Sequence, residues 1–171
     1  MGYDLYSETR KDIDDSDKYF RWNIWSWTPV LILANKYGWE PMGTKFLPLS
    51  EEDIIKYEIT PESVEADLTL VMEWDGNYTD NSGQLVVDED AQNMATALES
   101  SLDDIPTHPI LIPGQEEIGG NIKLDSNYFA HRNSVREGNF GSLMTEFSGT
   151  DSKDYLRKFI TFLRLGCFSI S

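Results

Sequence analysis

Six apolar residues between positions 91 and 105 follow one face of an α-helix, and this stripe constrains the fold more than any other feature of the chain. Its members are Ala91, Met94, Ala95, Leu98, Leu102 and Ile105. Because an α-helix repeats every 3.6 residues, this spacing places all six side chains on one side, where they can bury against a core. Asp88 or Asp90 can cap the start of the helix, and Pro106 ends it.

A second helix with the same kind of pattern is predicted at residues 150–166, TDSKDYLRKFITFLRLG. Its inward-facing residues are Leu156, Phe159, Ile160 and Leu163, and Gly166 supplies its end. Short strands are predicted at 66–74, 84–87 and 167–170 from their alternating or apolar character. The 171 residues are therefore expected to form a single globular α+β domain over residues 1–171, mainly helical with a few short strands.

Prolines and glycines divide the remaining sequence. Residues 16–26 can form a helix that breaks before Pro29, because a residue that precedes proline avoids the helical region. Pro29 fits the first position of a new helix, with Thr28 as its cap and Gly38 at its end. Residues 106–141 are rich in proline and glycine and are predicted to be irregular, which is where a binding loop would be expected.

The net charge of −16 is concentrated in one segment. Residues 51–104 hold sixteen acidic residues against a single basic one, Lys56, which leaves the rest of the chain nearly neutral. Such a field repels a phosphate backbone, so direct binding of nucleic acid is disfavoured, whereas a basic protein partner is favoured. The predicted partner surface consists of Glu51, Glu52, Glu62 and Glu65.

Two other interpretations of the acidic segment stay open. It can be a solvated face that keeps the protein in solution, since net charge mainly governs solubility and association rates. It can also belong to an inhibitor that mimics DNA, of the kind that phages use. A non-enzymatic binding protein that meets a basic partner is the function we favour at this stage.

The sequence contains no recognisable catalytic motif, so the catalytic residues are unknown and an enzyme is the less favoured class. It lacks a P-loop, a G-x-S-x-G elbow, an H-E-x-x-H pair and a G-x-G-x-x-G loop. Two histidines and one cysteine cannot build a tight transition-metal site, and the acidic loops at 12–17 and 75–81 lack the spacing of a calcium loop. We therefore expect no metal site and no cofactor.

The alternative function is a small-molecule-binding protein or small enzyme with a pocket of aromatic and arginine side chains. The stretch YFRWNIWSW at 19–27 is the most aromatic part of the chain, and HR at 131–132 holds the better-placed histidine. If 19–27 were helical, Arg21 would neighbour Trp25 and could stack on its ring. The candidate ligand-binding residues are Arg21, Asn23, Trp25, His131 and Arg132. The opposing interpretation is that the tryptophans fill the core, with Asn23 or a backbone carbonyl as the hydrogen-bond partner of an indole N–H.

Cys167 stands among apolar neighbours, which is typical of a buried and unreactive thiol.

The first residues do not show the basic and then hydrophobic pattern of a secretory signal, and no apolar run approaches the ~20 residues that cross a bilayer. We therefore expect a cytoplasmic protein without a membrane partner.

Several stretches resemble a family of uncharacterised small bacterial and phage proteins. The first motif is Met-Gly-x-Asp at residues 1–4, followed by Tyr-Phe-Arg-x-Asn-x-Trp-x-Trp-x-Pro at residues 19–29. Further similarity lies at 37–44, 81–102 and 159–170, where Cys167 replaces an expected glycine. The resemblance spans most of the chain and implies no activity, substrate or cofactor.

Overall fold

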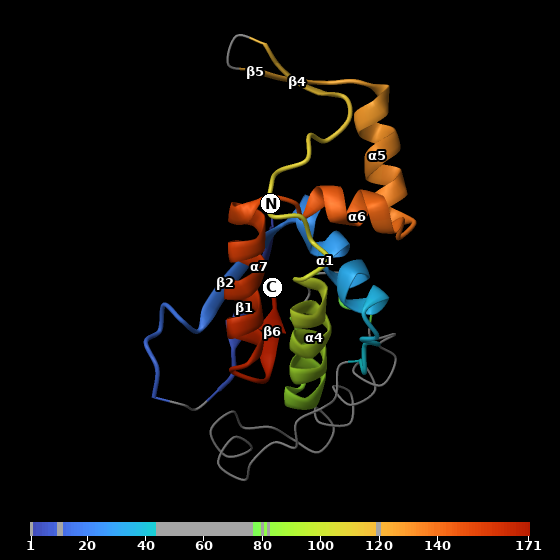
Figure 1. Cartoon of the computed structure of the whole chain (residues 1–171). Helices are drawn as coiled ribbons and strands as arrows, with labels where there is room; N and C mark the ends of the chain where they lie inside the picture. Colours follow the sequence, from blue (N-terminus) through green and yellow to red (C-terminus); the bar gives the residue numbers. More distant parts are fainter. Residues whose placement is uncertain (1, 10–11, 44–76, 80, 82, 119–120) are drawn as a thin grey trace, which may run out of the picture.

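The computed structural model describes residues 2–9, 12–43, 77–79, 81, 83–118 and 121–171. Within them the chain forms an α+β fold, as the sequence predicts (Figure 1). The helices are α1 (Ile24–Lys36), α4 (Asp88–Ser101), α5 (Ser126–Arg136), α6 (Phe140–Glu146) and α7 (Thr150–Leu163). The strands are β1 (Gly2–Ser7), β2 (Tyr19–Asn23), β3 (Gln84–Val86), β4 (Gln115–Ile118), β5 (Asn121–Leu124) and β6 (Phe168–Ile170).

Four strands form an antiparallel sheet in the order β2-β1-β6-β3. Strand β6 lies between β1 and β3, where Ile170 pairs with Leu5 on one side and with Gln84 on the other. Strands β3 and β6 confirm the predicted strands at 84–87 and 167–170, whereas the predicted strand at 66–74 lies outside the described residues. Strands β4 and β5 form a separate hairpin that projects away from the sheet and helices (Figure 1).

Helices α4 and α7 pack against each other and bury the two predicted apolar stripes (Figure 1). Five of the six stripe residues at 91–105 are buried, and Leu102 is half-buried. All four inward-facing residues of α7 are buried as well. The helical periods of the sequence therefore identify the main core correctly.

The predicted helix at 16–26 is wrong, because residues 19–23 form strand β2 beside β1. In this strand Phe20 and Trp22 point toward Phe159 of α7, whereas Arg21 and Asn23 are exposed. Side chains of a strand alternate between its two faces, and this alternation suits the order of apolar and polar residues here. The aromatic stretch thus changes from strand to helix at Asn23.

Helix α1 begins earlier than predicted, at Ile24, with Asn23 as its N-cap and Pro29 inside it. The side chain of Asn23 accepts hydrogen bonds from the backbone N–H groups of Trp25 and Ser26, at 2.9 and 2.8 Å. Thr28 is therefore not the cap. Gly38 does end the helix as predicted, with a positive φ of 94° that suits glycine.

The predicted irregular stretch at 106–141 is wrong in most of its length, because it contains the β4–β5 hairpin, all of α5 and the start of α6. Helix α5 escapes prediction because the buried residues of its inner face are His131, Arg132 and Val135, of which only the last is apolar. A helix that buries polar side chains gives no hydrophobic period. None of the helices in the described part of the chain is both long and apolar enough to cross a membrane.

Candidate functional site

The candidate site lies where helix α1 lacks a backbone hydrogen bond. Pro29 has no N–H, so the carbonyl oxygen of Trp25, four residues earlier, has no partner within the helix. A guanidinium N–H group of Arg132, on α5, donates to this oxygen instead. The missing hydrogen bond therefore explains why a buried arginine lies against α1.

Arg132 belongs to a buried group of three ionisable side chains with His131 and Glu146. Its Nη1 donates to Oε1 of Glu146 at 2.6 Å, and Nε2 of His131 lies 3.4 Å from Oε2 of the same carboxylate. The side chain of Glu146, the last residue of α6, is only 10% exposed. Because a buried charge is costly unless it is paired, the Arg132–Glu146 pair fixes α5 against α6 and α1.

Three of the five predicted ligand-binding residues meet at this place. His131 and Arg132 are adjacent on α5, and Cζ of Arg132 lies 5.9 Å from the centroid of the Trp25 ring. Trp25 is 60% exposed, whereas the Arg132 beside its ring is buried. The cation beside this ring is Arg132, and the expected helical pairing of Arg21 with Trp25 is wrong because Arg21 lies on β2.

The other two predicted residues have structural partners nearby. Arg21 has its Nε 3.7 Å from Oδ1 of Asp4 on β1, and its carbonyl oxygen accepts from the hydroxyl of Tyr155. Asn23 caps α1. Burial raises the pKa of Tyr155, which keeps this phenol protonated as the donor that joins α7 to β2.

The tryptophans of the aromatic stretch divide between core and surface. Trp27 is fully buried and donates from Nε1 to the carbonyl oxygen of Tyr78 at 2.7 Å. Trp22 is 4% exposed and packs edge-on against Phe159 and Tyr155. The core interpretation therefore holds for Trp22 and Trp27, and only Trp25 lies at the surface.

A cavity of about 330 Å³ lies beside these residues, at the N-terminal ends of α1 and α7. We name it the Trp22 pocket, and its lining residues are Trp22, Asn23, Ser26, Glu146, Phe147, Asp151, Ser152 and Tyr155. The lining thus combines three aromatic rings, two carboxylates, two serine hydroxyls and one amide. Sequence reasoning found Asn23 in this set but missed Glu146 and Asp151, because single acids carry no signal in so acidic a chain.

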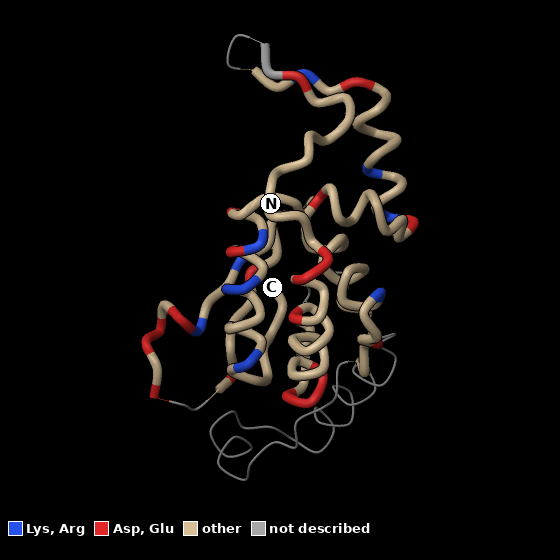
Figure 2. Tube along the Cα trace, viewed as in Figure 1, with Lys and Arg blue, Asp and Glu red and all other residues tan. Residues whose placement is uncertain are grey.

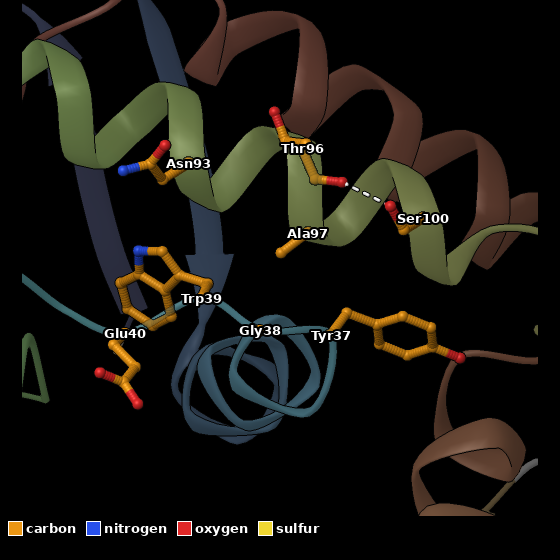
Figure 3. A pocket seen from close by; sticks show the side chains of 8 residues that line it. All are labelled: Tyr37, Gly38, Trp39, Glu40, Asn93, Thr96, Ala97 and Ser100. Carbon is orange, nitrogen blue, oxygen red and sulfur yellow. Dashed lines mark hydrogen bonds between the residues drawn. The ribbon is translucent and has the colours of Figure 1, made fainter.

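A second cavity, of about 380 Å³, lies between the end of α1 and α4 (Figure 3). We name it the Trp39 pocket. It is lined by Tyr37, Gly38, Trp39, Glu40, Asn93, Thr96, Ala97 and Ser100. The hydroxyl of Tyr37 donates to Oδ2 of Asp104 at 2.6 Å. Burial raises the pKa of Tyr37, and the hydrogen bond to Asp104 raises it further. The hydroxyl of Ser100 donates to the carbonyl oxygen of Thr96, so these hydroxyls already have partners within the protein (Figure 3).

Asp90 lies fully buried next to the Trp39 pocket, and both of its carboxylate oxygens accept hydrogen bonds. Its oxygens accept from Nε1 of Trp39 at 2.6 Å, from the hydroxyl of Tyr78 at 2.6 Å and from the backbone N–H of Met42 at 2.9 Å. Burial raises the pKa of Tyr78, and the hydrogen bond to Asp90 raises it further. The prediction that Asp88 or Asp90 caps α4 is wrong, because the N-cap is Val87 and no side chain forms a capping hydrogen bond there. The position of Asp90 four residues before Met94, on the apolar face of α4, is the signal that indicates burial.

Cys167 is half-buried, and its pKa is raised to about 11. Burial is the main cause, and the negative charges of Glu8 and Asp88 add to it. The thiol is therefore protonated at neutral pH and is a poor nucleophile, as expected from its apolar neighbours.

The four glutamates of the predicted partner surface, Glu51, Glu52, Glu62 and Glu65, lie outside the described residues. The described part of the acidic segment holds acidic residues at both ends of α4 (Figure 2). Of these, Asp88, Glu89, Asp103 and Asp104 are exposed. Among the described residues, no three His, Cys, Asp or Glu side chains come together in a way that could hold a metal ion.

Comparisons of the chain with protein-family models, with curated proteins and with solved structures find no match. The resemblance to the family of small bacterial and phage proteins stays a prediction.

Proposed function

We propose that this protein is a non-enzymatic binding protein that recognises a basic protein partner through its acidic segment. The observation that carries the proposal is the segregation of charge: residues 51–104 contain sixteen acids and one base, Lys56. Exposed carboxylates at the two ends of α4 belong to this segment, and residues 77–104 contain no lysine or arginine. A field of one sign attracts a surface of the opposite sign and speeds association.

The buried ionisable group argues against catalysis at the best histidine. A general base must reach the proton that it removes. His131 is buried against Glu146, and the charge of that carboxylate is compensated by Arg132. This arrangement is typical of an ion pair that holds helices together.

The test separates a partner surface from a solvated acidic face. The probe is an oligolysine peptide, titrated against the whole chain at low and moderate salt, with an oligoglutamate peptide as the negative control. One variant carries Glu89→Gln and Asp103→Asn, two exposed acids of the segment. A second carries Glu51→Gln, Glu52→Gln, Glu62→Gln and Glu65→Gln.

The matched control carries Asp12→Asn and Asp17→Asn, two exposed acids outside the segment with the same change of charge as in the first variant. We expect both segment variants to weaken oligolysine binding more than the control does, with unchanged melting temperature. The difference should shrink as salt rises, because salt screens exposed charges over about 8–10 Å. Equal weakening by segment and control variants would contradict the proposal and favour a solvated face.

A further inference from the structure

The wall of the Trp22 pocket contains one unused hydrogen-bond acceptor and one unused donor. The acceptor is Oε2 of Glu146, which lies 3.4 Å from Nε2 of His131 without forming a hydrogen bond to it, and the donor is the indole N–H of Trp22. Both atoms are buried without a hydrogen-bond partner, and both residues line the pocket. Buried polar groups in folded proteins are nearly always bonded, so two such atoms in one pocket wall need an explanation. Their opposite character indicates a ligand that both donates and accepts.

The charges around the pocket favour a ligand that carries both signs. Glu146 and Asp151 line it, and no lysine, arginine or histidine does. Arg132 compensates the charge of Glu146 from behind the wall, and the first turns of α1 and α7 add partial positive charge. A simple cation would leave the Trp22 N–H unpaired, whereas a simple anion would be repelled by Asp151.

We propose that the Trp22 pocket binds a small zwitterionic amine, in which an ammonium group lies a few atoms from a carboxylate or carbonyl oxygen. Its ammonium group donates to the carboxylates of Asp151 and Glu146. Its oxygen accepts from the indole of Trp22 and from the hydroxyl of Ser26 or Ser152. A free α-amino acid and the amino-terminal residue of a peptide share this chemistry.

The size and lining of the pocket agree with such a ligand. A volume of about 330 Å³ lies at the lower end of the range of about 300–1,000 Å³ for small-molecule sites, which fits an amino acid better than a nucleotide. The rings of Phe147 and Tyr155 provide an apolar wall for its carbon atoms. Asp151 is exposed in the first turn of α7, so it meets the ammonium group first. Oε2 of Glu146 and the N–H of Trp22 are buried, so the proposal requires side chains of the wall to rotate before the ligand reaches them.

The test follows the indole N–H signals by NMR while L-alanine, trialanine and their N-acetylated forms are titrated to about 10 mM, a range that detects millimolar affinity. A Trp22→Phe variant assigns the Trp22 signal in the spectrum. We expect this signal to shift with at least one ligand that has a free ammonium group and not with its acetylated form. A shift with alanine identifies a free amino acid as sufficient, and a shift with trialanine alone identifies the amino-terminal residue of a peptide.

A matched pair of variants tests the role of the carboxylate. Asp151→Asn removes the exposed charge of the pocket, whereas Asp154→Asn removes an exposed charge one turn further along α7 that does not line it. We expect Asp151→Asn to weaken binding by about tenfold, as the loss of a charge-assisted hydrogen bond does, and Asp154→Asn to leave it unchanged.

Two results would overturn the proposal. One is the absence of any shift at the Trp22 indole with all four ligands. The other is equal binding of the free and the acetylated forms, a comparison made on the unsubstituted protein and so independent of the folding of any variant. Neither result bears on the oligolysine experiment, because that surface consists of other residues.

Discussion

Two buried carboxylates in this protein have opposite surroundings. Asp90 accepts hydrogen bonds from Trp39, Tyr78 and the backbone of Met42, and all three donors are neutral. Glu146 lines a cavity and has one oxygen bonded to Arg132, whereas its second oxygen lies 3.4 Å from Nε2 of His131 without a hydrogen bond.

This difference separates a structural carboxylate from a candidate binding one. Asp90 joins the start of α4 to residues 39–42 and to Tyr78, and both its oxygens are used. With three hydrogen bonds accepted inside the fold, out of about four that a carboxylate can accept, Asp90 has little acceptor capacity left for a ligand. Glu146 keeps acceptor capacity where a ligand could use it.

The largest expected effect concerns Asp90. Asp90→Ala leaves two side-chain donors and one backbone donor buried without a partner, and we expect it to lower the free energy of unfolding by about 3–5 kcal/mol. Urea denaturation measures this change, with Glu89→Ala, an exposed neighbour on the same turn, as the control. A loss no greater than that of the control would show that the Asp90 network is not structural.

A smaller effect is expected at the other carboxylate. Arg132→Met removes the cation of Glu146 and the donor to the Trp25 carbonyl oxygen, at a place where both side chains are about nine-tenths buried. We expect a loss of about 2–3 kcal/mol, at or below the lower end for breaking a buried ion pair. Adding Glu146→Gln should recover part of this loss in a double-mutant cycle. No recovery would mean that the carbonyl bond, and not the ion pair, carries the effect.

The smallest expected effect concerns Tyr78, the phenol that donates to Asp90, and it appears as a loss of stability at high pH. Burial and the bond to Asp90 raise the pKa of Tyr78 above the ordinary value of 10.0. Above pH 10 the unfolded chain therefore releases a proton that the folded chain keeps, and stability falls as pH rises. The slope from one such group is up to about 1.4 kcal/mol per pH unit.

Urea midpoints between pH 9 and pH 11 measure this slope. Tyr78→Phe should make the slope shallower. Tyr6→Phe, which removes an exposed tyrosine, should leave it unchanged. Equal slopes for the wild type and Tyr78→Phe would contradict the buried role of this phenol.

The sequence predicts the parts of the fold that have a hydrophobic period. Helices α4 and α7 bury the expected stripes because nothing else in the sequence opposes their 3.6-residue pattern. The predicted helix at residues 19–23 is wrong because a short aromatic stretch fits a strand as well as a helix. Helix α5 has no hydrophobic period in the sequence because its buried face contains His131 and Arg132.

The candidate site was predictable only in part. Trp25, His131 and Arg132 meet as a set, although the reason lies in the missing N–H of Pro29 and not in any motif. Glu146 and Asp151 could not be singled out, because their importance depends on which helix ends converge at one cavity. The spacing of residues along the sequence does not show which distant helix ends come together in the fold.

The proline inside α1 links two positions that lie far apart in the chain. With Pro29 present, the Trp25 carbonyl oxygen depends on a donor from α5, so Arg132 cannot change without leaving that oxygen unpaired. With alanine at position 29, the helix would supply its own N–H, and position 132 would lose one of its constraints. Related sequences should therefore show covariation: an arginine at 132 accompanies a proline at 29, and where the proline is lost, position 132 is constrained only by the ion pair with Glu146 and varies more.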